Sequence, residues 1–226
     1  MKITVLSLFE NFFNEFKNTS IIKKAIANNL VDIEIVNFRN FSKDSHNKVD
    51  DTPYGGGAGM VLTLQPIVDA INHVKTSNSK VVLLTPSGKT YNQQIANQFK
   101  TFEHLILICG HYEGFDERII NYVDYEISIG DYILTGGEIA AMAILDSVIR
   151  LIPNVISVNS LESESFDNNL LDYPNYTKPY NFNGYKVPEV LLSGNHKEIN
   201  KVRKEWQINK TKINRKDLFI KYLKEN

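Results

Sequence analysis

Cysteine is almost absent from this chain, which has Cys109 as its only one among 226 residues. A single cysteine cannot form an intramolecular disulfide framework, and this fits a reducing compartment. Cys109 ends the apolar run that starts at His104, a position typical of a small buried residue and not of a nucleophile. No run approaches the roughly 18 apolar residues of a membrane span, and the N-terminal apolar stretch is too short for a signal peptide. We therefore expect a cytoplasmic protein with no membrane partner.

Motifs for metal and nucleophilic catalysis are also missing. The histidines are scattered and show no HExxH or Cys/His spacing, so no protein metal site is predicted. The chain has no GxSxG elbow and no Ser-His-Asp set, and its glycine-rich loop at 55–59 lacks the Gly-Lys-Ser/Thr ending of a P-loop. We expect the chemistry to belong to a bound small molecule.

Charge is nearly balanced over the whole chain but unevenly distributed. The net charge is -1, yet the last 31 residues carry ten Lys/Arg against four Asp/Glu. Such asymmetry indicates an anionic partner for the basic end. A solvated, lysine-rich helical face accounts for the same charge, so both interpretations stay open on charge alone.

Apolar periodicity predicts an α/β protein with a parallel sheet covered on both faces, because strand-like and helix-like segments alternate. Loops or turns are expected at 39–59 and 86–88, an irregular stretch at 154–183, and a small helical unit at 188–226. The predicted strands are 3–9, 31–38, 80–85, 104–109 and 125–128, and the predicted helices are 11–28, 66–74, 91–99 and 138–151, with a helical turn at 117–122. The last of these helices is apolar almost all round, which favours burial on more than one side, including at a subunit interface.

Glycine-bearing loops follow three of the predicted strands, at 84–88, 109–118 and 128–138. Ligands bind beyond the carboxyl ends of the strands of a parallel sheet, so these loops should converge on one small-molecule cleft. A single such loop would be an ordinary tight turn. The segment 50–59 has four glycines within five residues and can be a phosphate-cradling loop or a mobile surface loop.

Four long segments, in the same order along the chain, resemble the bacterial tRNA (guanine-N1)-methyltransferase family of the SPOUT class. They are Val49–Met60, Cys109–Arg118, Ser128–Glu138 and Val190–His196, and the likeness runs from Met1 to about Arg215. The resemblance implies an α/β SPOUT fold, mainly a parallel sheet with a deep trefoil knot, followed by a small, mainly helical C-terminal domain. The implied boundaries are a knotted S-adenosylmethionine-binding domain at 1–157, a linker at 158–178 and a tRNA-binding domain at 179–226.

The resemblance also implies an activity, namely methyl transfer from S-adenosylmethionine to N1 of the guanosine immediately 3′ of the anticodon in tRNA. The implied enzyme is a cytoplasmic homodimer with its active sites at the interface, and its nucleic-acid partner is tRNA and not DNA. Magnesium dependence is reported for the family, although this sequence offers no ligand set for Mg2+.

Site residues are carried over position by position from the same resemblance. The implied catalytic residues are Arg150, which would steady the target base, and Glu164, which occupies the place of the family's catalytic aspartate. The implied tRNA-binding residues are Asp50, Tyr54, Gly55, Gly56, Gly57, Ser193, Asn195, His196 and Arg203. The implied cofactor-binding residues are Leu84, Thr85, Pro86, Ser87, Gly110, Tyr112, Glu113, Ser128, Ile129, Gly130, Asp131, Tyr132, Ile133, Leu134, Gly136 and Gly137.

A carboxylate suits the implied reaction because N1 of guanine is protonated at neutral pH, and a general base can remove that proton as N1 attacks the methyl group. Glutamate at 164 has a similar intrinsic pKa to aspartate but one more methylene. Glu162 and Asp172 are the alternative bases in the same stretch. Arg150 has an alternative role as a cation at a helix C-terminus.

The C-terminal region departs further from the family pattern. Val202 and Arg203 stand where the family has a Trp-Arg pair, with Trp206 four residues on, and Lys178 replaces an arginine. Lysine contacts phosphate as a point charge without the bidentate fork. RNA binding should survive these changes with altered geometry.

Two rival functions remain at this level. A SPOUT methyltransferase acting on ribosomal RNA or on a ribose 2′-hydroxyl would share the fold and the methyl donor, but should lack the segments at 50–59 and 191–196. An RNA-binding module with a decayed active site is the second rival, and the intact glycine loops argue against it.

Overall fold

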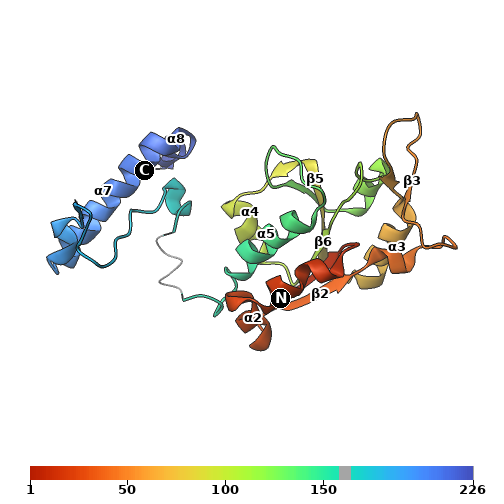
Figure 1. The fold of residues 1–226 in the computed structure, drawn as a ribbon, viewed down its shortest axis with the longest axis horizontal. Coiled ribbons are helices and arrows are strands. Elements are labelled where there is room, and N and C mark those ends of the chain that lie inside the picture. The colour runs from red at the N-terminus through yellow and green to blue at the C-terminus, as the bar shows by residue number, and fades with distance from the viewer. Residues whose placement is uncertain (158–163, 226) are drawn as a thin grey trace. The chain divides into compact units, whose positions relative to one another are not determined.

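The computed structural model describes residues 1–157 and 164–225 (Figure 1). The chain divides into two compact units, Met1–Ile156 and Ser157–Asn226. Among the described residues, no helix is both long enough and apolar enough to cross a membrane.

The first unit is built on a five-stranded sheet in which every pairing is parallel, with the strand order β2-β1-β6-β5-β7. This confirms the predicted α/β class. The three loops of the predicted cleft come from β5, β6 and β7, and β5 lies between β6 and β7 in the sheet. The strands are β1 (Lys2–Leu6), β2 (Asp32–Val36), β5 (Ser79–Thr90), β6 (His104–Ile108) and β7 (Tyr125–Ser128).

Both faces of the sheet are buried, as the continuous apolar runs of the strands require. On one face, Leu6, Ile106 and Leu83 join a core with the helix α3 (Leu64–Val74) and the 3-10 helix η3 (Glu117–Tyr122). The alternate strand residues, which include the fully buried Val5 and Leu107, point to the other face. There α2 (Ser20–Ala27) and α4 (Gln93–Phe99) contact α5 (Glu138–Ile149) (Figure 1).

The helix predicted at 11–28 is wrong as a single element. The chain forms η1 (Glu10–Phe13), α1 (Asn14–Asn18) and α2, with a break at Thr19 and Ser20. Thr19 has extended backbone angles, and its hydroxyl donates a 2.6 Å hydrogen bond to the carbonyl of Glu15. Such local bonds from threonine compete with helix continuation, and Ser20 turns the chain with a φ of 43°.

The predicted turn at 86–88 lies inside β5. Both Leu84 and Lys89 are in register with Ile127 of β7, so residues 85–88 bulge out of the ladder and the strand then resumes. A Cβ on Gly88 would lie 2.4 Å from the backbone nitrogen of Ile127. Glycine is therefore required where the returning strand meets β7.

The loop predicted at 39–59 contains short regular elements that its composition does not indicate. The 3-10 helix η2 (Phe38–Phe41) buries Phe38, and β3 (Asp50–Asp51) pairs antiparallel with β4 (Val61–Leu62). The pairing closes residues 52–60 into a protruding loop whose base is anchored in the core through Leu62.

The second unit is mainly helical, as predicted for residues 188–226. This unit also contains a short β-hairpin. Its first strand lies within the stretch at 154–183 that was predicted to be irregular. A small core of Leu170, Ile199 and Leu218 is buried in this unit. The elements are η4 (Asp167–Asn169), β8 (Asn181–Phe182), β9 (Tyr185–Lys186), η5 (Glu189–Leu192), α7 (His196–Asn214) and α8 (Lys216–Glu225).

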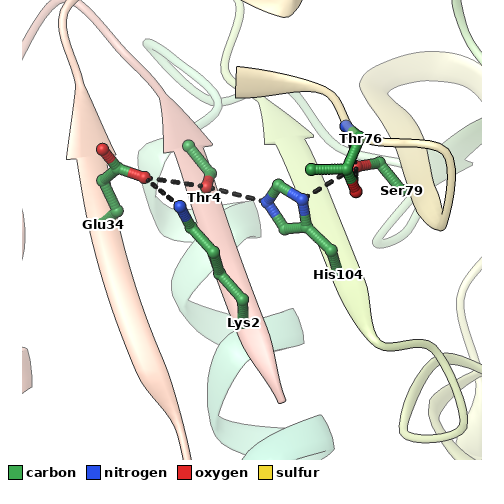
Figure 2. Close-up of polar contacts among 6 residues, drawn as sticks. All are labelled: Lys2, Thr4, Glu34, Thr76, Ser79 and His104. Carbon is green, nitrogen blue, oxygen red and sulfur yellow. Dashed lines mark hydrogen bonds and ion pairs between the residues drawn. The ribbon is translucent and has the colours of Figure 1, made fainter.

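A buried polar network lies where β1, β5 and β6 begin, at the edge of the sheet opposite their carboxyl ends (Figure 2). The two ring nitrogens of His104 lie 2.9 Å from the Thr4 hydroxyl and 2.8 Å from the Ser79 hydroxyl. Thr4 also donates to Glu34, which Lys2 contacts at 2.8 Å. Burial and the neighbouring Lys2 charge lower the pKa of His104.

Candidate donor and RNA sites

Three loops from the adjacent strands β6, β5 and β7 line one cleft of about 440 Å³. Residues 84–87 enter from the bulge of β5, residues 110–115 follow β6, and residues 128–137 follow β7. The convergence expected from the sequence is therefore present at the carboxyl edge of the sheet. A cleft of this size falls in the usual range for a small-molecule site.

Of the cofactor-binding residues implied by the resemblance, only Asp131 does not line this cleft. The structure adds several lining residues that the sequence argument missed. His111 and Phe115 lie inside the same motif and could have been found from it, whereas Glu126 and Ala140 carry no local signal. The full set of additions is Leu83, His111, Gly114, Phe115, Glu117, Ile119, Ile120, Glu126, Ile127, Thr135 and Ala140.

Close backbone approach explains the glycine pair that precedes α5. A Cβ on Gly137 would lie 2.7 Å from the Cα atom of Cys109 and 2.8 Å from the backbone nitrogen of Gly110. The amide of Gly137 donates a 2.9 Å hydrogen bond to the carbonyl of Gly110. The loop after β7 is thus seated directly on the loop after β6, and any side chain at 137 would separate them.

A buried carboxylate, that of Glu138, lies next to the contact between the loops after β6 and β7. Glu138 is only 5% exposed and accepts a 2.7 Å hydrogen bond from the Ser7 hydroxyl at the end of β1. A Cβ on Gly136 would meet both the Glu138 carboxylate and the Nδ1 atom of His111. This nitrogen is buried and has no hydrogen-bond partner among residues 1–157 and 164–225. Burial and the Glu138 charge raise the pKa of the Cys109 thiol, so Cys109 is an unreactive buried residue.

The glycine-rich loop at 52–60 is tied to the cleft through the loop after β6. The amide of Glu113 donates to the carbonyl of Met60 at 3.0 Å, and the amide of Leu62 donates to the carbonyl of Gly114 at 2.9 Å. The Glu113 side chain lies against Gly59, where a Cβ would be 2.4 Å from its Cγ atom. Glu113 therefore faces the cleft and contacts the glycine-rich loop at the same time.

The implied tRNA-binding residues of this loop are open to solvent. Tyr54 is fully exposed, and a Cβ on Gly55 or Gly56 would meet no atom within 4 Å. These glycines have φ values of 86° and 78°, so backbone conformation and not crowding requires them. Asp50 is half-buried in β3.

The implied catalytic residues lie in different units. Arg150 is the C-cap of α5 in the first unit. Glu164 of the second unit is half-buried, while Glu162 lies outside the described residues. The carboxylate of Asp172 accepts hydrogen bonds from the Tyr173 amide at 2.7 Å and the Asn175 side chain at 3.4 Å. Asp172 is thus engaged in a local turn.

The motif at 190–196 starts a helix. Gly194 has a φ of 69°, and the Asn195 side chain accepts a 3.3 Å hydrogen bond from the Glu198 amide as N-cap of α7. Ser193 accepts from the Asn195 amide, and His196 is the first residue of α7. Arg203, further along α7, places its guanidinium 4.5 Å from the centre of the Tyr173 ring. These contacts give Asn195 and Arg203 structural roles in the second unit.

Within residues 1–157 and 164–225, no group of three or more His, Cys, Asp or Glu side chains could hold a metal ion.

Comparison with known proteins decides the family. Residues 1–221 match the family model of the tRNA (guanine-1)-methyltransferase TrmD. The chain belongs to this family. A tRNA (guanine-N(1)-)-methyltransferase of Ureaplasma urealyticum is 58% identical over 99% of this chain and 98% of its own length. Proteins of the same name from Mycoplasma capricolum and Borrelia duttonii are 54% and 51% identical, over 96% and 99% of this chain and 91% and 94% of their own lengths.

Proposed function

We propose that this chain is a cytoplasmic enzyme that transfers a methyl group from S-adenosylmethionine to N1 of the guanosine immediately 3′ of the anticodon in tRNA. The observation that carries the proposal is the cleft lined by three loops at the carboxyl edge of the sheet, in a chain that matches the methyltransferase family over residues 1–221. Full-length relatives at 51–58% identity bear the name of this activity.

The cleft has the features that a nucleoside-sulfonium donor needs. Apolar side chains such as Leu84, Ile129 and Leu134 give walls for an aromatic base, and the glycines at 110, 130 and 136 add no side chain to the lining. The donor brings an activated methyl group, so the protein supplies no nucleophile. The raised pKa of the Cys109 thiol agrees with this, because it removes the chain's only cysteine from nucleophilic chemistry.

The proton on N1 requires a base, and we assign that role to Glu164. Glu164 occupies the place of the family's catalytic aspartate, which supports it over Asp172, whose carboxylate takes part in a turn with the Tyr173 amide and the Asn175 side chain. Arg150 at the C-cap of α5 is the proposed contact for the target base. Residues 179–226 are the proposed tRNA-binding domain, after a linker at 158–178, and the chain carries 12 Lys/Arg against 5 Asp/Glu from Lys178 onward.

A homodimer fits an exposed apolar patch on the first unit, which we call the α5 patch and define as Phe9, Phe12, Ile21 and Ile139. These side chains are 41–48% exposed, and η1 and α2 contact α5. Along α5, Ile139 and Ala143 share an exposed stripe with Asp146, while seven residues of the helix are buried. Covering this stripe with a second copy would explain why the helix is apolar all round.

Methyl transfer from labelled S-adenosylmethionine to unmodified tRNA transcripts tests the proposal. Matched transcripts should carry guanosine or adenosine 3′ of the anticodon, with and without Mg2+. We expect label only in the guanosine transcript, mapped to N1. Label in the ribose, or only in ribosomal RNA, would show a different SPOUT activity. Donor binding without any transfer would show an inactive site.

A further inference from the structure

The β8–β9 hairpin of the second unit carries large aromatic side chains that are exposed to solvent. All residues from Asn175 to Lys186 are exposed, with Phe182 at 64% and Tyr185 at 83%. Within residues 164–225, neither of these two rings contacts another aromatic ring or a cation. Exposure of large aromatic groups at a protruding tip is unfavourable in water and indicates a binding role.

The hairpin has a defined turn and its own hydrogen bonds. Asn183 and Gly184 have φ values of 52° and 91°, as a two-residue type I′ turn requires. The Gly184 amide donates a 2.9 Å hydrogen bond to the Asn181 side chain, and the Val187 amide donates to the carbonyl of Tyr180 at 2.9 Å. These bonds fix the orientation of both strands.

The register places the aromatic side chains on one face. Phe182 lies directly opposite Tyr185, and Asn181 lies opposite Lys186. Side chains alternate along a strand, so Tyr180 shares the face of Phe182 and Tyr185, while Lys186 belongs to the other face. The result is an exposed aromatic face, defined as Tyr180, Phe182 and Tyr185, with a lysine beside it.

The charged residues around the aromatic face indicate which class of ligand it binds. No Asp or Glu occurs between Asp172 and Glu189, whereas Lys178 and Lys186 flank the aromatic residues. Aromatic planes next to lysines, without acids, are the combination that binds unpaired nucleotides by base stacking and phosphate contact. A protein partner would not require both the ring planes and the absence of negative charge.

We propose that the aromatic face of the β8–β9 hairpin stacks on unpaired bases of the RNA substrate, with Phe182 and Tyr185 as the stacking residues. This rests on the proposed function for the identity of the RNA. The proposal deepens that function by naming a contact to single-stranded nucleotides, separate from the donor cleft and from the general base.

Binding of an unmodified tRNA transcript by single and double variants, measured by fluorescence anisotropy, tests this directly. We expect Phe182→Ala and Tyr185→Ala each to weaken binding by about 5-fold to 100-fold, the range for loss of one stacked base. The double variant Phe182→Leu with Tyr185→Leu keeps apolar surface but removes the aromatic ring planes. It should weaken RNA binding as much as the alanine variants do. The exchange Phe182→Tyr with Tyr185→Phe keeps both rings and should bind like the unaltered chain.

A matched control removes exposed apolar area from α8 of the same unit. Ile220→Ala with Leu223→Ala, at 54% and 61% exposure, should leave RNA affinity unchanged. The aromatic variants should also keep the salt dependence of binding. Lys178→Ala with Lys186→Ala should instead reduce the slope of log affinity against log salt by about 0.7–0.9 per lost phosphate contact.

Three results would overturn the proposal: unchanged affinity of the alanine variants, full rescue by leucine, or a change in oligomeric mass that accounts for the loss. The last two would assign the face to protein packing. If the unaltered chain binds tRNA in a ring-dependent way but transfers no methyl group, the proposed function fails while the stacking face stands.

Discussion

Glu164 is the residue on which the proposed chemistry depends most. We expect Glu164→Gln to lower the rate of methyl transfer by about 10²–10⁴-fold, the usual contribution of a general base, with donor affinity unchanged. Glu164→Asp should retain substantial activity because it keeps the carboxylate and restores the family's residue. Single-turnover methylation and calorimetric donor titration would measure the two effects.

The matched control for Glu164 is Asp172→Asn. Its carboxylate accepts bonds from the Tyr173 amide and the Asn175 side chain, so this change should act mainly on stability. Near-full activity of Glu164→Gln would move the base to Asp172 or Glu162.

His104 makes folding stability depend on pH. Its pKa is lowered by burial first and by the Lys2 charge second, against the opposing charges of Glu34 and Asp32. The unfolded chain therefore binds more protons as pH falls below about 6.5, the ordinary histidine value, and stability is lost from there through the lower folded pKa. Above that value the stabilisation is fully present.

Urea unfolding at about pH 7.5 and about pH 5.5 brackets this window, because the ordinary pKa of histidine lies between the two. We expect the unaltered chain to lose unfolding free energy on acidification and His104→Gln to lose less of it, since glutamine can still donate to Thr4 but does not titrate. Glu34, whose pKa is lowered mainly by the hydrogen bond from Lys2, should contribute only at more acidic pH. Equal losses in both proteins would rule out His104 as the source.

Single residues also show what sequence alone could deliver. Glycine at 110, 136 and 137 indicates that the backbone at these positions leaves no room for a side chain. The cleft could therefore be predicted from local motifs. The role of Glu138 could be identified only once β1 and the loop after β7 were brought together in space. It comes from a contact between segments over a hundred residues apart, the hydrogen bond from Ser7 to Glu138.

At the scale of elements, the contact between the loops after β6 and β7 is the most sensitive part of the cleft. Gly137 has a φ of -80°, which alanine adopts without strain, so Gly137→Ala tests crowding alone. Its Cβ would lie 2.7 Å from Cys109 and 2.8 Å from Gly110, both backbone contacts that cannot move cheaply. We expect a loss of about 1–3 kcal/mol in stability and a clear loss of donor affinity.

Gly194→Ala is the control for this variant. Gly194 has a φ of 69° with no atom within 4 Å of an added Cβ, so the change introduces backbone strain without a clash. It should cost about 1–2 kcal/mol and leave donor affinity unchanged. Unimpaired donor binding by Gly137→Ala, measured by calorimetry, would contradict the role given to the loop contact.

Elements with strong local periodicity, such as β6 and α5, could be predicted from the sequence. The break at Thr19 and the extension of β5 to Thr90 could not, because the second depends on pairing with β7 after a four-residue bulge. The strand order β2-β1-β6-β5-β7 likewise follows from tertiary pairing. The trefoil knot stays a prediction of the family resemblance, since periodicity carries no information about threading.

At the scale of the whole molecule, the α5 patch leads us to predict that the chain forms a homodimer. Ile139→Asp places a charge on an exposed position of α5, at 45% exposure, where it should not disturb the folded core. In a homodimer the same change would bury an unpaired charge at the interface, which is strongly unfavourable. We expect the unaltered chain to be a dimer by light scattering and Ile139→Asp to be a monomer at the same micromolar concentration.

The methyl-transfer activity of Ile139→Asp shows whether residue 139 lies at a functional subunit interface or on an ordinary surface. If the active site is completed by the partner subunit, methyl transfer by Ile139→Asp should fall in proportion to the lost dimer and recover as protein concentration is raised. Gln94→Asp, at an exposed position of α4 outside the α5 patch, is the matched surface control for an added charge. A monomeric unaltered chain, or a monomeric variant with full activity, would show that the α5 patch has another use, because subunit contact would then contribute nothing to the reaction.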